Sequence, residues 1–229
     1  MVRGQPPQLG PAGRGAHHLL GCLPVGEDLS PASVQIAAEL VKRTGAEADF
    51  VAAVVYDAPA ALAAAGHQPG SFDLVYTGGG ALCWLPDIAA WAQVVAELLA
   101  PGGMLFVRDF HPVMLALSDP RQDGLLVLEH PYFERAEPTT WADGQTYAGG
   151  ADAPPITATR SHEWNHGIAE TVTAVLAAGL QLELLREDRT SNWAFDPDHM
   201  VELGDHEHQL ADRPERLPHT FTLRVRKAG

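Results

Sequence analysis

The stretch FDLVYTGGGALCWLPDIAAWAQVVAELLAPGGMLFVRDFHPV, residues 72–113, decides the fold of this 229-residue chain. Residues 74–76 and 104–107 are short apolar runs, which is the pattern of strands buried on both faces. Between them, residues 88–99 place apolar side chains at helical spacing, and Pro101 follows directly. Two buried strands joined by one helix predict a βαβ unit, and therefore a parallel sheet with helices packed on its faces.

A second unit of this kind precedes the first. Residues 23–31, LPVGEDLSP, predict a short strand that ends in Glu27 and Asp28. Ser30 and Pro31 then supply the cap and the first-turn proline that begin a helix. Residues 48–59, ADFVAAVVYDAP, predict the next strand and its turn.

The two ends of this α/β pattern set the domain boundaries. Residues 1–22 are rich in Gly, Pro and Arg, and no apolar strand or amphipathic helix flanks their glycines, so we expect an irregular N-terminal arm. Residues 23–229 form one predicted domain. Within it, residues 114–160 carry many prolines and several aromatic residues, which predicts a cap inserted after the strand at residues 104–107.

Three segments together resemble class I S-adenosylmethionine-dependent methyltransferases. They are FDLVYTGGGALCWLPD, LLAPGGMLFVRD, and residues 164–187 with their Ala-Gly-Leu turn. The resemblance implies an α/β fold of the Rossmann-like, doubly wound type, with a mostly parallel sheet and an antiparallel last strand at residues 219–226. It also implies the cofactor S-adenosyl-L-methionine and transfer of its methyl group to a small-molecule substrate.

The resemblance assigns cofactor contacts to the ends of two strands. Asp28 falls on the acidic residue that accepts hydrogen bonds from both ribose hydroxyls, a role that suits a carboxylate at the carboxyl end of a strand, and Leu29 follows it. Val54 stands where the family usually has an acid for the adenine amino group. The replacement is either Asp57 or the backbone amide of Val55.

Further contacts follow the next two strands. The loop under the methionine part of the cofactor corresponds to Thr77, Gly78 and Gly79, and the segment beside the adenine and the transferred methyl includes Leu82. His111 is the candidate catalytic base, because an imidazole titrates near neutral pH and this one directly follows a buried strand. The alternative is a structural histidine before Pro112.

One departure from the family supports a second interpretation. The family's glycine loop would fall near Pro11, in QLGPAGRG, which has glycines but no preceding strand and no acid. Val54 would also cost one adenine hydrogen bond, worth about 1 kcal/mol. The alternative function is therefore a catalytically impaired or non-catalytic methyltransferase-like protein that has lost cofactor binding.

The motif HEWNH, residues 162–166, raises a remote alternative of a zinc hydrolase. That chemistry needs His162 and His166 on one face of a continuous helix. Here Gly167 follows directly and helical spacing begins only afterwards, so we interpret the motif as a strand-to-helix connection and expect no metal. The two histidines then face the substrate or serve surface and capping roles.

Composition and charge limit the partners and the cellular location that we expect for this protein. The formal net charge of −14 disfavours nucleic acid as a partner, and an apolar content of 46% supports a sizeable core. No long apolar run predicts a membrane span or a secretory signal. Only two cysteines, Cys22 and Cys83, argue against a disulfide framework and for a cytoplasmic location. The sequence carries no signal for an oligomeric state.

Overall fold

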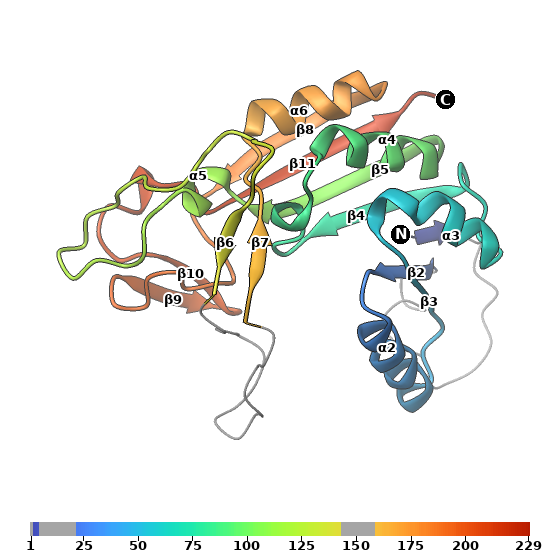
Figure 1. Cartoon of the computed structure of the whole chain (residues 1–229), viewed down its shortest axis with the longest axis horizontal. Helices are drawn as coiled ribbons and strands as arrows, with labels where there is room; N and C mark the ends of the chain where they lie inside the picture. The colour runs from blue at the N-terminus through green and yellow to red at the C-terminus, as the bar shows by residue number, and fades with distance from the viewer. Residues whose placement is uncertain (1, 5–21, 143–158) are drawn as a thin grey trace.

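The computed structural model describes residues 2–4, 22–142 and 159–229, and its centre is a sheet of seven strands in the order β3-β2-β1-β4-β5-β11-β8 (Figure 1). The strands are β1 (Val2–Gly4), β2 (Cys22–Asp28), β3 (Asp49–Ala52), β4 (Phe72–Gly78), β5 (Leu99–Phe110), β8 (Leu180–Asp188) and β11 (Thr220–Lys227). β2 pairs with β3 and β4 with β5 in parallel, whereas β11 runs antiparallel to β5 and β8. The predicted Rossmann-like α/β fold with an antiparallel last strand is confirmed.

The helices lie on both faces of this sheet. α2 (Pro31–Thr44) connects β2 to β3, and α4 (Ile88–Leu98) connects β4 to β5. These two connections step in opposite directions along the sheet, so right-handed crossovers put α2 and α4 on opposite faces. α3 (Ala58–Ala64) and α6 (Ile168–Ala177) both pack against α4 (Figure 1). The sheet is therefore doubly wound, as predicted.

The main core lies between α4, α6 and the sheet. α4 buries one stripe of side chains, which confirms the helical spacing of residues 88–99. The stripe consists of Ile88, Trp91, Ala92, Val94, Val95 and Leu98. It faces Leu105 and Val107 of β5 and Leu223 and Val225 of β11, which are fully buried. Burial of this apolar surface is the main stabilising contribution to the sheet.

Both crossover helices begin where the sequence indicates. The Ser30 side chain accepts a hydrogen bond from the Ser33 amide at 3.2 Å and caps α2, with Pro31 in its first turn. Asp87 caps α4 by accepting from the Ala90 amide at 2.8 Å. Each cap satisfies an amide that the helix itself leaves without a partner.

The chain between β5 and α6 leaves the main sheet. After α5 (Pro112–Leu115), strand β6 (Thr139–Trp141) pairs with β7 (Ser161–Glu163) in a separate ribbon. Figure 1 shows this ribbon at the end of the sheet toward which β4 and β5 point. We call residues 116–142 the insertion; they make up most of the described part of the predicted cap at residues 114–160, of which residues 143–158 lie outside the described chain.

Smaller elements complete the described chain. β9 (Met200–Gly204) and β10 (Glu207–Leu210) form a hairpin. Single 3-10 turns are η1 (Val55–Asp57), η2 (Leu82–Trp84) and η3 (Pro214–Arg216). None of the helices in the described ranges has the length and apolar character needed to span a bilayer.

The described part of the predicted N-terminal arm differs from the expectation of an irregular segment. Val2–Gly4 forms β1 in the middle of the sheet and runs antiparallel to both β2 and β4. Three residues are too few to show a strand pattern in the sequence, which is why it was not predicted. The glycines of QLGPAGRG lie outside the described residues, and a domain boundary at residue 22 stays a prediction.

We expect Trp91→Ala to lower the free energy of unfolding by about 3–5 kcal/mol, because the indole is 1% exposed in the main core. Ile36→Ala on α2 is the control: its side chain is 71% exposed, and its effect should stay within about 0.5 kcal/mol. Urea denaturation followed by circular dichroism measures both. Equal effects would contradict this placement of the core.

Candidate active site

The predicted site residues lie at one edge of the sheet. β2 and β3 end together, with Asp28 paired to Ala52, and β4 and β5 end together, with Gly78 paired to Arg108. Because β2 to β5 point the same way, Asp28, Thr77 and His111 all come to the carboxyl edge. In open α/β sheets this edge is where ligands bind.

The β2–β3 part of this edge offers one carboxylate and an apolar surface. One oxygen of Asp28, Oδ1, accepts a hydrogen bond from the Ser30 amide at 2.7 Å. Leu29 is 71% exposed and Val54 is 52% exposed, so both side chains are available to a ligand. Val55, by contrast, packs against the main core.

The loop after β4 is held by a residue that the sequence analysis did not select, Asp109. Its carboxylate is 4% exposed and accepts hydrogen bonds from four backbone amides. These are Gly80 at 2.6 Å, Ala81 at 3.1 Å, Leu82 at 2.9 Å and Phe110 at 2.8 Å. Burial raises the pKa of Asp109 above its ordinary value, and the four amides oppose that rise. The sequence signal that could have identified Asp109 is an acid at the end of a buried strand that follows a strand ending in a glycine loop.

The glycines of this loop are required by its geometry. A Cβ on Gly78 would lie 2.1 Å from the Arg108 carbonyl oxygen, and Gly79 and Gly80 have φ angles of 74° and 85°. A Cβ on Gly79 would meet no atom within 4 Å, so this part of the loop faces open space. Leu82, in contrast, turns its side chain into the main core.

His111 has both ring nitrogens engaged. Nδ1 accepts from the Val113 amide at 3.2 Å and caps α5, so Nε2 carries the proton and donates to Glu187 Oε1 at 2.7 Å. Burial lowers the pKa of His111, which favours the neutral ring. In this conformation the imidazole offers no free lone pair, and its role as a base stays a prediction.

Glu27 lines a small cavity that was not predicted. The cavity measures about 90 Å³ and is bordered by Glu27 of β2, Tyr76 of β4 and Trp91 of α4. Burial, reinforced by the neighbouring charge of Asp28, raises the pKa of Glu27 to about 7. A carboxyl in this position therefore exchanges its proton near neutral pH.

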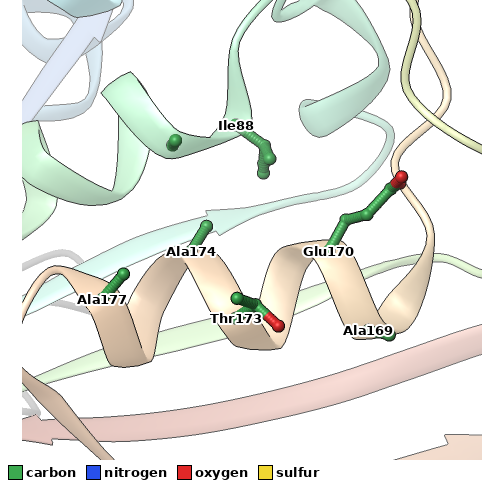
Figure 2. Close-up of a pocket in the computed structure, with 7 residues that line it drawn as sticks. Ile88, Ala169, Glu170, Thr173, Ala174 and Ala177 are labelled. Carbon is green, nitrogen blue, oxygen red and sulfur yellow. The ribbon is translucent and has the colours of Figure 1, made fainter.

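A larger groove of about 410 Å³ lies between α4 and α6 (Figure 2). Its lining is mostly small and apolar and shares no residue with the predicted cofactor-binding set. The lining residues are Ile88, Ala89, Ala169, Glu170, Thr173, Ala174 and Ala177. We assign the groove to the helix packing and place the candidate site at the carboxyl edge.

The zinc-hydrolase alternative is wrong. His162 lies on strand β7 and His166 precedes α6, so the two rings do not share a helix face. The interpretation of HEWNH as a strand-to-helix connection is confirmed. Across the described ranges, no group of three His, Cys, Asp or Glu side chains is arranged to hold a metal ion.

Comparisons with known proteins agree with this fold. A family profile described as "Methyltransferase domain" matches residues 13–105. A Listeria monocytogenes protein assigned to the S-adenosylmethionine-dependent methyltransferases has 14% identity and a TM-score of 0.56, over 90% of this chain and 79% of that one. An S-adenosylmethionine-dependent methyltransferase from Clostridium acetobutylicum has 11% identity and a TM-score of 0.54, over 90% and 75%. No curated protein matches the sequence.

The profile covers less than half of the chain, and the solved structures show that the chain shares the Rossmann-like fold of S-adenosylmethionine-dependent methyltransferases. The same fold also occurs in the [4+2]-cyclase SpnF, at 14% identity and a TM-score of 0.51, over 89% of this chain and 65% of that one. The fold alone therefore does not fix the reaction, and the site residues have to carry that argument.

Asp109→Asn should lower the free energy of unfolding by roughly 2–4 kcal/mol, because one of the two acceptor oxygens becomes an NH2 group that faces two backbone amides. Asp123→Asn is the matched control, since Asp123 pairs with Arg121 at the surface and its loss should have little effect. Chemical denaturation compares the two variants. A loss for Asp109→Asn no larger than for the control would contradict the anchoring role.

Glu27→Gln should stabilise the protein at pH 8 by about 1–2 kcal/mol, a value reduced for partial solvent screening. The folded-state pKa of about 7 exceeds the ordinary 4.5, so wild-type stability falls as pH rises from about 4.5 to about 7. Denaturation curves at pH 4 and pH 8 should show the difference only at the higher pH. Glu97→Gln, on the exposed side of α4, should show no such pH-dependent difference.

Proposed function

We propose that the chain binds S-adenosyl-L-methionine along its carboxyl edge and transfers the methyl group to a small molecule. One observation carries the proposal: the glycine loop after β4 is fixed by Asp109 and leaves Gly79 facing open space, on the same edge as Asp28. Glycine backbone exposed at this edge suits close approach to a ligand. The residues present therefore fit the cofactor that the family implies.

The holding residues follow from this arrangement. Asp28 would accept hydrogen bonds from the ribose hydroxyls, with Leu29 beside it. The exposed Val54 and the backbone of Val55 would line the adenine. Under the methionine part we place Thr77, Gly78 and Gly79, with Leu82 supporting the loop from the core side.

The chemistry that the cofactor supplies is an electrophilic methyl group on a sulfonium. The chain's own contribution is to hold the two reactants in line and to exclude water, which by itself lowers the barrier substantially. His111 would act as a base only for a substrate that must lose a proton, and only after its proton moves to Nδ1 or Nδ1 loses its contact with the Val113 amide.

A small and flat substrate is supported by an aromatic surface next to the loop. Phe110, at the end of β5, lies against Gly80 and packs on Trp193 with ring centroids 5.5 Å apart. Trp193 is 45% exposed and is therefore accessible to a ligand. The net charge of −14 opposes a nucleic-acid substrate.

The cytoplasmic location stays a prediction. It rests on the cysteine content, and in the described structure Cys22 and Cys83 are not joined by a disulfide. A reducing compartment is the simplest setting for a chain with two thiols.

A second candidate function, a methyltransferase-like protein without cofactor binding, is favoured by the direction of β1. In an intact family member, the central strand ends at the carboxyl edge and delivers the first glycine loop there. Here β1 runs against β2 and β4, so the chain after Gly4 starts from the opposite edge. The exposed valine at position 54 removes one further polar contact.

Calorimetric titration with S-adenosylhomocysteine decides between the two. Binding at micromolar affinity is the expected result, and Asp28→Asn should weaken it roughly tenfold, because the neutral amide is a poorer acceptor for the ribose hydroxyls. Glu39→Gln removes one exposed acid from the neighbouring α2 and should leave the affinity unchanged. No detectable binding by the wild-type chain would favour the second candidate.

A further inference from the structure

The HEWNH motif has no part in the proposed methyl transfer, yet its last two residues connect separate parts of the chain. Asn165 Nδ2 donates to the carbonyl oxygens of Pro112, at 2.7 Å, and Pro131, at 2.9 Å. His166 is 5% exposed and contacts the Leu85 carbonyl and the Glu134 carboxylate. These contacts tie the insertion to α5 and to the segment after β4.

The contacts of His166 fix how many protons it shares with Glu134. Nε2 lies 2.7 Å from the Leu85 carbonyl oxygen, which can only accept, so Nε2 carries a hydrogen. Nδ1 lies 2.7 Å from Glu134 Oε2, and one more proton must sit between these two atoms. Without it, two lone pairs would face each other at hydrogen-bond distance.

The same proton-sharing pair is joined to both neighbouring helices. Glu134 Oε2 accepts weakly from the Ile88 amide at 3.3 Å, in the first turn of α4. The Glu134 amide donates to Glu170 Oε2 at 3.1 Å, and the Gly167 amide donates to the same oxygen at 2.7 Å. Figure 2 shows Glu170 in the first turn of α6, at one end of the groove between the two helices.

We propose that His166 is a positioning residue whose shared proton with Glu134 locks the insertion onto residues 79–88, and that the lock opens when this proton leaves to solvent. The importance of residues 79–88 for a cofactor rests on the proposed function. The lock itself does not, because it is built only from contacts within the chain.

Further acidic and ionisable groups lie beside the pair. Glu170 Oε2 accepts from the Glu134 amide, and burial together with the charges of Asp87 and Glu134 raises the pKa of Tyr56, whose hydroxyl accepts from the Asp87 amide. Removing the proton leaves the Nδ1 lone pair of His166 facing the Glu134 carboxylate, whose side chain is 31% exposed, so the two side chains repel and separate.

The variant Glu134→Gln tests whether the contact between His166 and residue 134 depends on the shared proton. A neutral His166 can donate from Nε2 to Leu85 and accept at Nδ1 from the new amide, so this variant keeps both contacts without the shared proton. Hydrogen exchange followed by mass spectrometry, on protein without cofactor, reports opening at residues 79–88 and 131–136. Comparing variant and wild type at each pH cancels the intrinsic pH dependence of exchange.

From about pH 6 to about pH 9.5 we expect exchange in the wild type to rise severalfold relative to Glu134→Gln, because only the wild-type contact needs the shared proton. His166→Gln should exchange fast at every pH, since it loses the two-sided contact. His162→Gln, which changes the exposed histidine bonded to Thr140, should follow the wild type. A constant ratio between wild type and Glu134→Gln, or fast exchange of Glu134→Gln at all pH values, would overturn the proposal.

Titration of the same samples with S-adenosylhomocysteine separates this proposal from the proposed function. If the ligand binds, its affinity should fall with rising pH in the wild type and stay level in Glu134→Gln. If the wild type does not bind it at any pH, the proposed function fails, while the exchange data still decide whether the lock exists.

Discussion

The site depends on one buried carboxylate. Asp109 stands at the end of β5 and accepts from the amides of the neighbouring loop, so it fixes the path of the chain where β4 ends. Without such an acceptor, three consecutive amides would be buried at an edge where no further strand pairs with them, at a cost that a marginally stable domain cannot absorb. The glycines leave room for this path, and the carboxylate holds it in place. The shape of the loop therefore depends on both the glycines and the Asp109 carboxylate.

The sequence predicted the parts of the fold that rest on local pattern. The βαβ unit around α4 and the cap at Ser30 each need only neighbouring residues to be recognised. Asp109 was missed because its importance comes from amides about thirty positions earlier in the chain, and no local period encodes that contact. β1 was missed because its three residues gain their partners only from β2 and β4.

The direction of β1 differs from the direction that cofactor binding in methyltransferases of this fold would require. The strand occupies the central position of the sheet, where it supplies pairing for the amino-terminal halves of β2 and β4 through Val2, Pro24 and Leu74. It thus meets the structural demand of the fold, which is to avoid open strand edges in the middle of a sheet. Its direction, however, does not serve the functional demand of delivering a loop to the carboxyl edge. The stability of the sheet and the binding of a cofactor are therefore separable properties of this position.

The HEWNH segment shows why a short motif needs its context. The same residues on a continuous helix would present two imidazoles to one metal ion. Here Gly167 ends the extended segment, and Tyr132 occupies the space that a side chain at this position would need, so the segment turns before α6 can begin. His166 is thereby carried inward to the Leu85 carbonyl, while His162 stays outside on β7. Because of this single turn, two histidines whose spacing is typical of a metal site instead lie apart, and His166 forms hydrogen bonds within the chain.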